Sequence, residues 1–355
     1  MSVYKEFSIE PPSSPESGDV ITNVKDIISS GMWANGAGSL SAYYTSSTQS
    51  GSNSAHYLDV YAANPATDST ARPQFSVTYG HYKGSGSIGI KGADGTRASA
   101  TMYRQLSQTL LGPNEDQFTF AGTGDHIKPA YIYAISVSRQ QLREKMDPGN
   151  WELHLSASGV LFGLPGTFKV IDDSGATANA NVNQGGRVFN IVSGSISAGV
   201  GDVNTTATAQ PGGGLGLFYP DLGILIFNGP VLDASASLGT ITTSNTEGGN
   251  LGKFYGALTS SLPPYFSARR EEVITSQHYF CRVPNKEFNF SSNPSFATAS
   301  DGTMTQSTFF KNPKTFITQV GLYNDDSELL AVAKLSKPLL KSYSREAIVK
   351  IKLDF

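Results

Sequence analysis

The chain has few cysteines and few charged residues. It contains one cysteine in 355 residues, Cys281, which excludes an internal disulfide framework. Charged residues make up 15% of the chain and the net charge is −3, so no basic surface for nucleic acid is expected. No apolar run is long enough to span a bilayer, and the N-terminal stretch shows no apolar signal segment. We therefore expect a protein that is made in the cytoplasm and binds neither membrane nor nucleic acid.

Sequence motifs of known chemistry are also lacking. Neither a G-x-S-x-G nucleophile elbow nor a Walker A loop occurs. The five histidines are isolated, whereas a zinc site usually shows at least one close ligand pair. The stretch GSGSIG (84–89) has the form of a dinucleotide fingerprint, but glycine and a turn follow it instead of a helix. The sequence thus predicts no catalytic residue, no cofactor and no metal. This search for motifs would miss a glycosidase, which needs only two carboxylates, because the sequence does not show which carboxylates lie together.

The polarity of the chain comes from Ser, Thr, Asn and Gly, with 37 glycines and 18 prolines. These residue types favour turns and strands over helices, because their side chains or backbones compete with helical hydrogen bonding. Nineteen Phe and sixteen Tyr can supply a core. We expect a mainly β fold of the α+β class, with a few short helices, antiparallel sandwich-like sheets and Gly/Ser-rich insertions.

Four regions are expected along the chain: an extended Pro-rich arm (1–18), a mixed α/β region (19–158), a Gly/Ser/Asn-rich β region (159–262) and a C-terminal antiparallel β domain (263–355). The sequence leaves open whether the third region is a separate domain or an insertion.

Local patterns predict individual elements within these regions. Apolar spacing and stop signals predict helices in 19–36, in 97–115 and from Ser138 to a turn at 147–149. Alternation and apolar runs predict strands at 74–82, 130–138, 151–155, 273–283, 288–292, 303–310, 315–323, 328–336 and 347–355, and one or two buried strands, joined near Pro220, within 214–233.

The stretch TFITQVGLYNDDSELLAVAKLSKPL (315–339) is predicted to form a hairpin. Asn324 to Ser327 supply the turn, since Asn and Asp tolerate left-handed backbone. The carboxylates there do not fit the spacing of a hand-type calcium loop. An internal role is favoured over an edge offered to a partner, because six apolar residues would bury against a second sheet. These are Val320, Leu322, Leu329, Leu330, Val332 and Leu335.

Candidate interface residues come from three parts of the chain. Aromatic residues on polar loops recur at interfaces, and the segment 41–65 is rich in tyrosine. Arg269 and Arg270, followed by two glutamates, predict a solvated or interfacial ion-pair patch. Phe355 suggests a docked terminus, and Cys281 is expected to be a buried small hydrophobe. The candidate interface residues are Tyr43, Tyr44, Tyr57, Tyr61, Arg269, Arg270, Tyr323 and Phe355.

Several stretches resemble proteins of tailed bacteriophages. GLYNDDSELLAVAKLSKPL (321–339) resembles a hairpin of tail, baseplate and fibre-attachment proteins. Other stretches are similar to virion structural proteins of T-even-like, contractile-tailed phages. They are KDIISSGMWANG (25–36), RQLSQTLLGPNEDQFTF (104–120), DPGNWELHL (147–155), GLFYPDLGILIFN (216–228), ARREEVITSQHYFCRVPNKEFNFSSNPSF (268–296) and NPKTFITQVGLYNDDSELLAVAKLSKPL (312–339).

The resemblance implies a non-enzymatic component of the virion, in the tail, baseplate or neck. Its expected partners are other virion proteins and copies of itself in a symmetric assembly. No catalytic residue or cofactor comes with the resemblance. Two alternatives rank below it: a receptor-binding or capsid-decorating module on the particle surface, and then a particle-borne polysaccharide hydrolase.

Overall fold

The computed structural model describes residues 7, 19–46, 56–87, 97–161, 164–176, 181–197, 200–206, 208–209, 213–244, 248–260, 265–298 and 301–354. The chain forms two compact units, a large unit (28–272) and a small unit (1–27 with 273–355). Residues 159–262 belong to the large unit together with 28–158, so they do not form a compact unit of their own. The predicted arm (1–18) lies outside the described residues except for Phe7.

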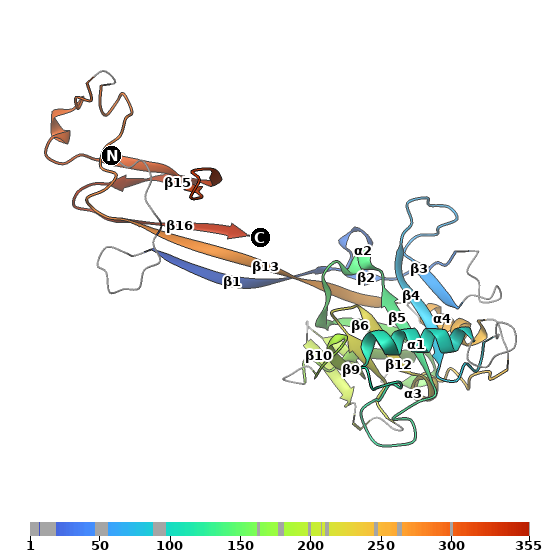
Figure 1. Ribbon diagram of the computed structural model, residues 1–355. Helices are drawn as coiled ribbons and strands as arrows, with labels where there is room; N and C mark the ends of the chain where they lie inside the picture. The colour runs from blue at the N-terminus through green and yellow to red at the C-terminus, as the bar shows by residue number, and fades with distance from the viewer. Residues whose placement is uncertain are drawn as a thin grey trace. The chain divides into compact units, whose positions relative to one another are not determined.

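The fold is mainly β with a few short helices, which confirms the predicted class (Figure 1). The strands are β1 (Val20–Gly31), β2 (Ser39–Leu40), β3 (Tyr57–Tyr61), β4 (Pro73–His81), β5 (Tyr131–Val137), β6 (Lys145–Leu161), β7 (Leu164–Asp172), β8 (Asn181–Asn183), β9 (Gly186–Ser197), β10 (Val200–Thr205), β11 (Gly216–Tyr219), β12 (Ile224–Asn228), β13 (Phe266–Val283), β14 (Thr315–Tyr323), β15 (Leu329–Lys341) and β16 (Ala347–Asp354). The helices are α1 (Ala98–Leu110), α2 (Arg139–Leu142), α3 (Gly229–Ser235) and α4 (Gly249–Thr259), with short 3₁₀ turns η1 (Ala34–Gly36) and η3 (Ser307–Phe309).

The large unit is built on one long antiparallel sheet. Its strands follow the order β13-β6-β7-β9-β11-β12-β5-β4-β3, so β13 and β4 lie near opposite ends. Yet the rings of Phe75 on β4 and Phe266 on β13 lie 5.5 Å apart between centroids. Trp33, which precedes η1, packs 4.8 Å from Phe266 and 5.9 Å from Phe75. The sheet therefore curves around a shared aromatic core.

Strand β5 shows how both faces of this sheet are covered. Tyr133 and Ile135 point into the main core with α4, whereas Ile132 and Ala134 belong to a second cluster under α1. In Figure 1, α1 lies across the strands of the large unit. Burial on two faces explains why β5 reads as an unbroken apolar run rather than an alternating one.

The predicted elements in the large unit are largely confirmed. Helix α1 lies within the predicted range 97–115, and strands β4 and β5 lie within one residue of their predicted positions. Helix α2 starts where predicted but is shorter, because it ends at Leu142 and β6 begins at Lys145, before the predicted turn. The apolar stretch around Pro220 forms two antiparallel strands, β11 and β12, joined by the predicted turn. In the small unit, β14 and β16 agree with their predicted strands, whereas β15 continues to Lys341, beyond the predicted end at residue 336.

The predicted helix in 19–36 is wrong, because this segment forms the extended strand β1. The spacing of apolar residues in 19–36 fits a helix, but six of the first nine residues of β1 are Val, Ile or Thr. Such β-branched side chains lose rotamer freedom in a helix and suit a strand. Strand β13 lies beside β1 in the sheet and supplies its backbone partners.

Three further local predictions are corrected. The turn predicted at 147–149 lies inside β6, where Trp151 opposes Ala268 and Met146 opposes Arg270, so the intervening residues of β6 bulge out of register.

The strands predicted at 288–292 and 303–310 are loops and the turn η3. Phe290 from the first stretch and Phe309 from the second both pack on Phe296, which lies between the two stretches in sequence. The ring centroids lie 5.6 Å and 4.9 Å from that of Phe296.

Replacing Phe266 with alanine should destabilise the protein strongly. The ring is fully buried against Trp33, Phe75 and Trp151, and deletion would open a cavity where strands from both ends of the sheet meet. We expect a loss of about 3–5 kcal/mol in the free energy of unfolding, measured by urea denaturation. Val182→Ala is the control, because Val182 is 76% exposed. Equal losses in the two variants would contradict the closure of the sheet around this ring.

Candidate interaction surface

The hairpin turn of the small unit is formed as predicted. The backbone N–H of Ser327 donates to the carbonyl of Asn324 at 3.0 Å, and that of Asn324 donates to the carbonyl of Glu328 at 3.0 Å. The side-chain oxygen of Asn324 accepts a further hydrogen bond from the N–H of Glu328 at 2.7 Å. Ser327 has a φ of +63°, so the turn uses the left-handed conformation. The side chain of Asn324 thus fixes the register of β14 and β15.

The predicted internal role of this hairpin is not borne out by its burial. Strands β14 and β15 form a separate two-stranded sheet, and several of its large apolar side chains remain exposed. Leu330 is 67% exposed, and Leu329 and Val332 are also exposed. Val320, Leu322 and Leu335 are only half-buried. The sequence pattern correctly identified a strand with apolar residues, but it carries no information on whether a second sheet lies against it.

Strand β16 adds to the open apolar area of the small unit. It pairs antiparallel with the second half of β13, from Ser276 opposite Asp354 to Val283 opposite Ala347. Val349 and Ile351 are buried, whereas Ile348 on the other face is 66% exposed. Lys350 shares that exposed face and lies over the ring of Phe280 at 5.5 Å.

Exposed apolar side chains concentrate in the small unit, which holds fewer than a third of the residues. We call this set the apolar surface. Its members are Val20, Val24, Ile27, Phe288, Phe290, Phe310, Phe316, Tyr323, Leu329, Leu330, Val332, Tyr343 and Ile348. Among the described residues, the large unit exposes only five large apolar side chains: Ile28, Tyr44, Tyr57, Val182 and Leu222. Contiguous apolar patches mark surfaces that other molecules cover, which makes this set the candidate for such a surface.

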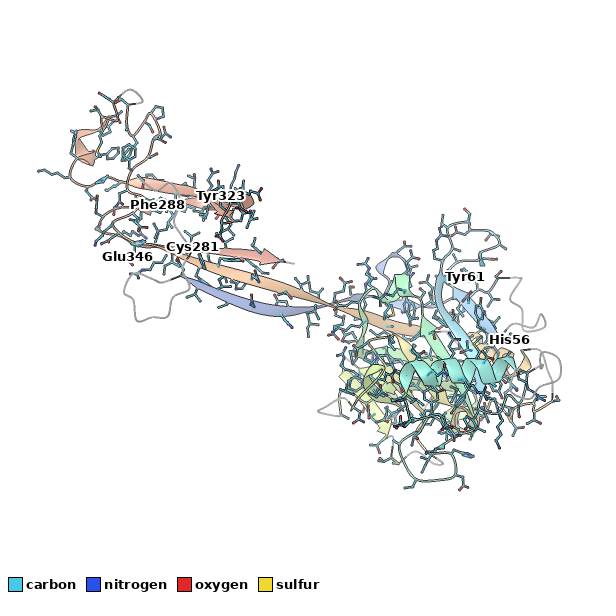
Figure 2. All side chains as sticks on the ribbon, viewed as in Figure 1. His56, Tyr61, Cys281, Phe288, Tyr323 and Glu346 are labelled. Carbon is cyan, nitrogen blue, oxygen red and sulfur yellow. The ribbon has the colours of Figure 1, made fainter. Side chains whose placement is uncertain are left out.

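The four candidate tyrosines of the large unit divide into two pairs by exposure. Tyr44 and Tyr57 are exposed, whereas Tyr43 and Tyr61 are half-buried. The ring of Tyr43 packs edge-on against Phe75 at 5.9 Å, and burial raises the pKa of its hydroxyl. Tyr61 pairs through its backbone with Tyr44 (Figure 2). Only Tyr44 and Tyr57 are therefore available to a partner.

The two candidate arginines also differ. Arg269 is exposed, but Arg270 is buried and donates from Nε to the hydroxyl of Ser30 at 2.8 Å. Arg270 also lies 3.4 Å from Glu272, and Glu271 pairs with Lys145 at 3.1 Å. The predicted ion-pair patch exists, but Arg270 belongs to the interior of the large unit rather than to an exposed interface.

The remaining sequence candidates lie in or near the small unit. Tyr323 is exposed on β14, where its ring and Leu329 pack over Gly321; a Cβ at Gly321 would lie 2.9 Å from the ring (Figure 2). Cys281, predicted to be buried, is half-buried. Phe355 lies outside the described residues.

Two buried polar clusters of the large unit could have suggested catalysis. His154 contacts the carboxylate of Glu152 at 2.5 Å, and Lys169 lies 3.3 Å from the same oxygen. Asp233 accepts hydrogen bonds from the hydroxyls of Tyr131 at 2.8 Å and Tyr133 at 3.1 Å. These carboxylates are enclosed by the fold and satisfied by it, which is typical of structural networks.

The glycine-rich stretch of the large unit is occupied by its own side chains. Its described part, residues 84–87, lies at the start of α1, where the hydroxyl of Ser87 accepts a hydrogen bond from the N–H of Ser99 at 3.2 Å. A phosphate would need the same donor. Within the described ranges, no three His, Cys, Asp or Glu residues come together as a metal site. No described helix combines the length and apolar character needed to span a membrane.

Comparison with models of protein families, with curated proteins and with solved structures finds no match to this chain.

Replacing Glu152 with glutamine should weaken the pH dependence of stability. Burial raises the pKa of this carboxyl, but hydrogen bonds from His154 and the Ile196 N–H, together with the charge of Lys169, outweigh burial and hold it below its usual value. A lowered pKa in the folded state contributes stability that is present above the unfolded value of about 4.3 and is lost as pH falls through the folded value. In urea denaturation, Glu152→Gln should be less stable at pH 7 and should lose less stability between pH 7 and pH 3. An unchanged pH profile would contradict the network.

Replacing Leu330 and Val332 with serine should remove apolar surface without unfolding the protein. Both side chains are exposed, and substitutions at exposed sites usually change the free energy of unfolding by about 0.5 kcal/mol or less. We expect weaker fluorescence of a bound hydrophobic dye and an unchanged melting temperature. Val182→Ser in the large unit is the control for loss of one exposed valine. A loss above about 2 kcal/mol in the double variant would mean that these side chains pack internally.

Proposed function

We propose that this protein is a non-enzymatic structural component of a tailed bacteriophage particle, in its tail, baseplate or neck. The observation that supports the proposal best is the apolar surface of the small unit. In water, such a surface favours association, because burying it releases about 25 cal/mol for each Å² removed from solvent. The sequence resemblance to virion proteins of contractile-tailed phages supplies the biological setting.

The hairpin β14–β15 gives a second reason for a partner. An isolated two-stranded hairpin is marginally stable in water, because it lacks a third strand or a packed face. Here both strands present exposed apolar residues, including Phe316 and Leu330. Neighbouring subunits in a symmetric assembly would supply the missing cover. The N-terminal arm (1–18) is proposed as a further docking element, with other virion proteins and copies of this chain as partners.

The large unit fits the same role. Its aromatic core is closed, its buried carboxylates Glu152 and Asp233 are held in internal networks, and its exposed apolar side chains are few. A surface role at the outside of the particle, in receptor binding or capsid decoration, is the second candidate. The exposed rings of Tyr44 and Tyr57 favour it, since exposed aromatic residues are typical of recognition surfaces.

Cryo-electron microscopy of the purified particle would test the proposal directly. We expect side-chain density for this chain in an ordered ring of the tail, baseplate or neck, with the apolar surface covered by neighbours. Particles assembled with Leu330→Ser/Val332→Ser should contain less of the protein, whereas Val182→Ser should be incorporated normally. Density on the capsid surface or at fibre tips would instead support the second candidate. Absence of the chain from the particle would refute both and reopen an enzymatic role.

A further inference from the structure

The large unit contains a cleft of about 860 Å³ that none of the roles above uses. Its walls come from the segment 33–42, from the connection between β3 and β4, from α2 and from Arg270. Small side chains leave this space open. Six alanines line it: Ala34, Ala37, Ala42, Ala62, Ala63 and Ala71.

Internal hydrogen bonds fix two walls of the cleft before any ligand arrives. Gln74 is fully buried, and its side-chain oxygen accepts a hydrogen bond from the N–H of Ala34 at 2.9 Å. Its side-chain nitrogen donates to the carbonyl of Arg72 at 2.9 Å. One glutamine thus ties the η1 segment to the start of β4, and a preorganised cleft loses little entropy on binding.

The cleft carries an excess of guanidinium groups. Arg72, Arg143 and Arg270 line it, and the first two are exposed to solvent. Arg143 and Arg270 share one carboxylate, that of Glu272, at 3.3 and 3.4 Å. The acidic lining residue, Asp68, is engaged by the N–H and hydroxyl of Thr70 at 2.8 and 2.7 Å. With Asp68 counted beside Glu272, three arginines face two carboxylates, which leaves one positive charge available to a ligand.

Two residues that line the cleft have positive φ angles. Arg143 has φ +55° and ψ −90°, a region that residues other than glycine rarely adopt, and Asn35 has φ +59°. Both line the cleft. Strained residues persist where the fold enforces them, and they cluster at binding sites. The strain holds Arg143 at the C-terminal end of α2.

The chemistry of the walls narrows the class of ligand. Guanidinium groups bind carboxylates in bidentate geometry, and alanine walls accept small or apolar side chains. The aromatic lining residue Trp33 is buried, so it offers no open ring face for stacking a sugar or a base. These features fit a peptide turn that carries several carboxylates beside apolar residues.

We propose that this cleft binds the acidic turn 324–328 of a second copy of the chain. The turn places three carboxylates within four residues, Asp325, Asp326 and Glu328, which is the densest acidic cluster in the sequence. All three are exposed, and the exposed Leu329 and Leu330 follow directly. The charge of the turn thus complements that of the cleft, and its apolar flank complements the alanine walls.

Such a contact joins different surfaces on the two copies. Each copy would offer one cleft and one turn, so the interface is heterologous and continues into a ring or a filament. The inference rests on the proposed function, which requires contacts between neighbouring subunits, and it names one of them.

A charge-swap experiment on the full-length chain tests the contact. Arg72→Glu/Arg143→Glu reverses the cleft, Asp325→Lys/Asp326→Lys reverses the turn, and Asp125→Lys/Asp202→Lys alters two exposed carboxylates outside the cleft as a control. In sedimentation velocity at low salt, the wild type and the control should self-associate, and 1 M salt should weaken that association. Each reversed variant alone should associate at least tenfold more weakly. A mixture of the two reversed variants should associate like the wild type, because each then meets opposite charge.

The urea midpoint of each variant shows whether it folds. The single variant Arg72→Glu, which leaves Arg143 in place, should also weaken association. A wild type that stays monomeric, or mixing that restores nothing, would overturn the inference. Normal incorporation into particles in that case would leave the proposed function standing. The melting temperature of Asp325→Lys/Asp326→Lys gives a further check. If it falls by an amount that does not depend on protein concentration, the turn binds the cleft of its own chain, and the assignment to a second copy is overturned.

Discussion

The contact between Phe75 and Phe266 is the constraint on which the large unit depends. The two rings come from strands near opposite ends of the sheet order, and Trp33 packs against both. Burial of these rings compensates for the entropy of bringing distant segments together. The same closure brings the η1 segment beside the start of β4, where Gln74 completes one wall of the cleft. The core and the cleft therefore form together.

The two units differ in how completely they bury their apolar residues. The large unit places its aromatic side chains in two core clusters, one on each face of the sheet, with helices covering both faces. The small unit leaves Phe316, Leu330 and Ile348 open to solvent. Because water penalises that exposure, the small unit is the part of the chain that gains most from a neighbour. This asymmetry is what a subunit of a large assembly requires, and it underlies the proposed virion role.

The polar groups of the large unit serve two different purposes. Glu152, Asp233 and Glu271 lie inside networks of hydrogen bonds and ion pairs that satisfy them. Arg72 and Arg143 lie at an open cleft and are exposed to solvent. In the proposed contact, the acidic turn of the hairpin is the chemical counterpart of that cleft. Apolar burial would then supply most of the association free energy, and the charged contact would select the partner and its orientation.

Sequence alone determined the features that depend on neighbouring residues along the chain. The Ser, Thr and Gly content indicated a mainly β fold, the apolar spacing in 98–110 gave α1, and Asn324 with its two following aspartates gave the hairpin turn. Tertiary structure decided whatever depends on a distant partner. Segment 20–31 became a strand because β13 lies beside it, and Arg270 was buried because Ser30 and Glu272 surround it. Leu330 stayed exposed because no second sheet covers it. Local patterns encode backbone preference, whereas burial and pairing are set by contacts between residues far apart in the chain.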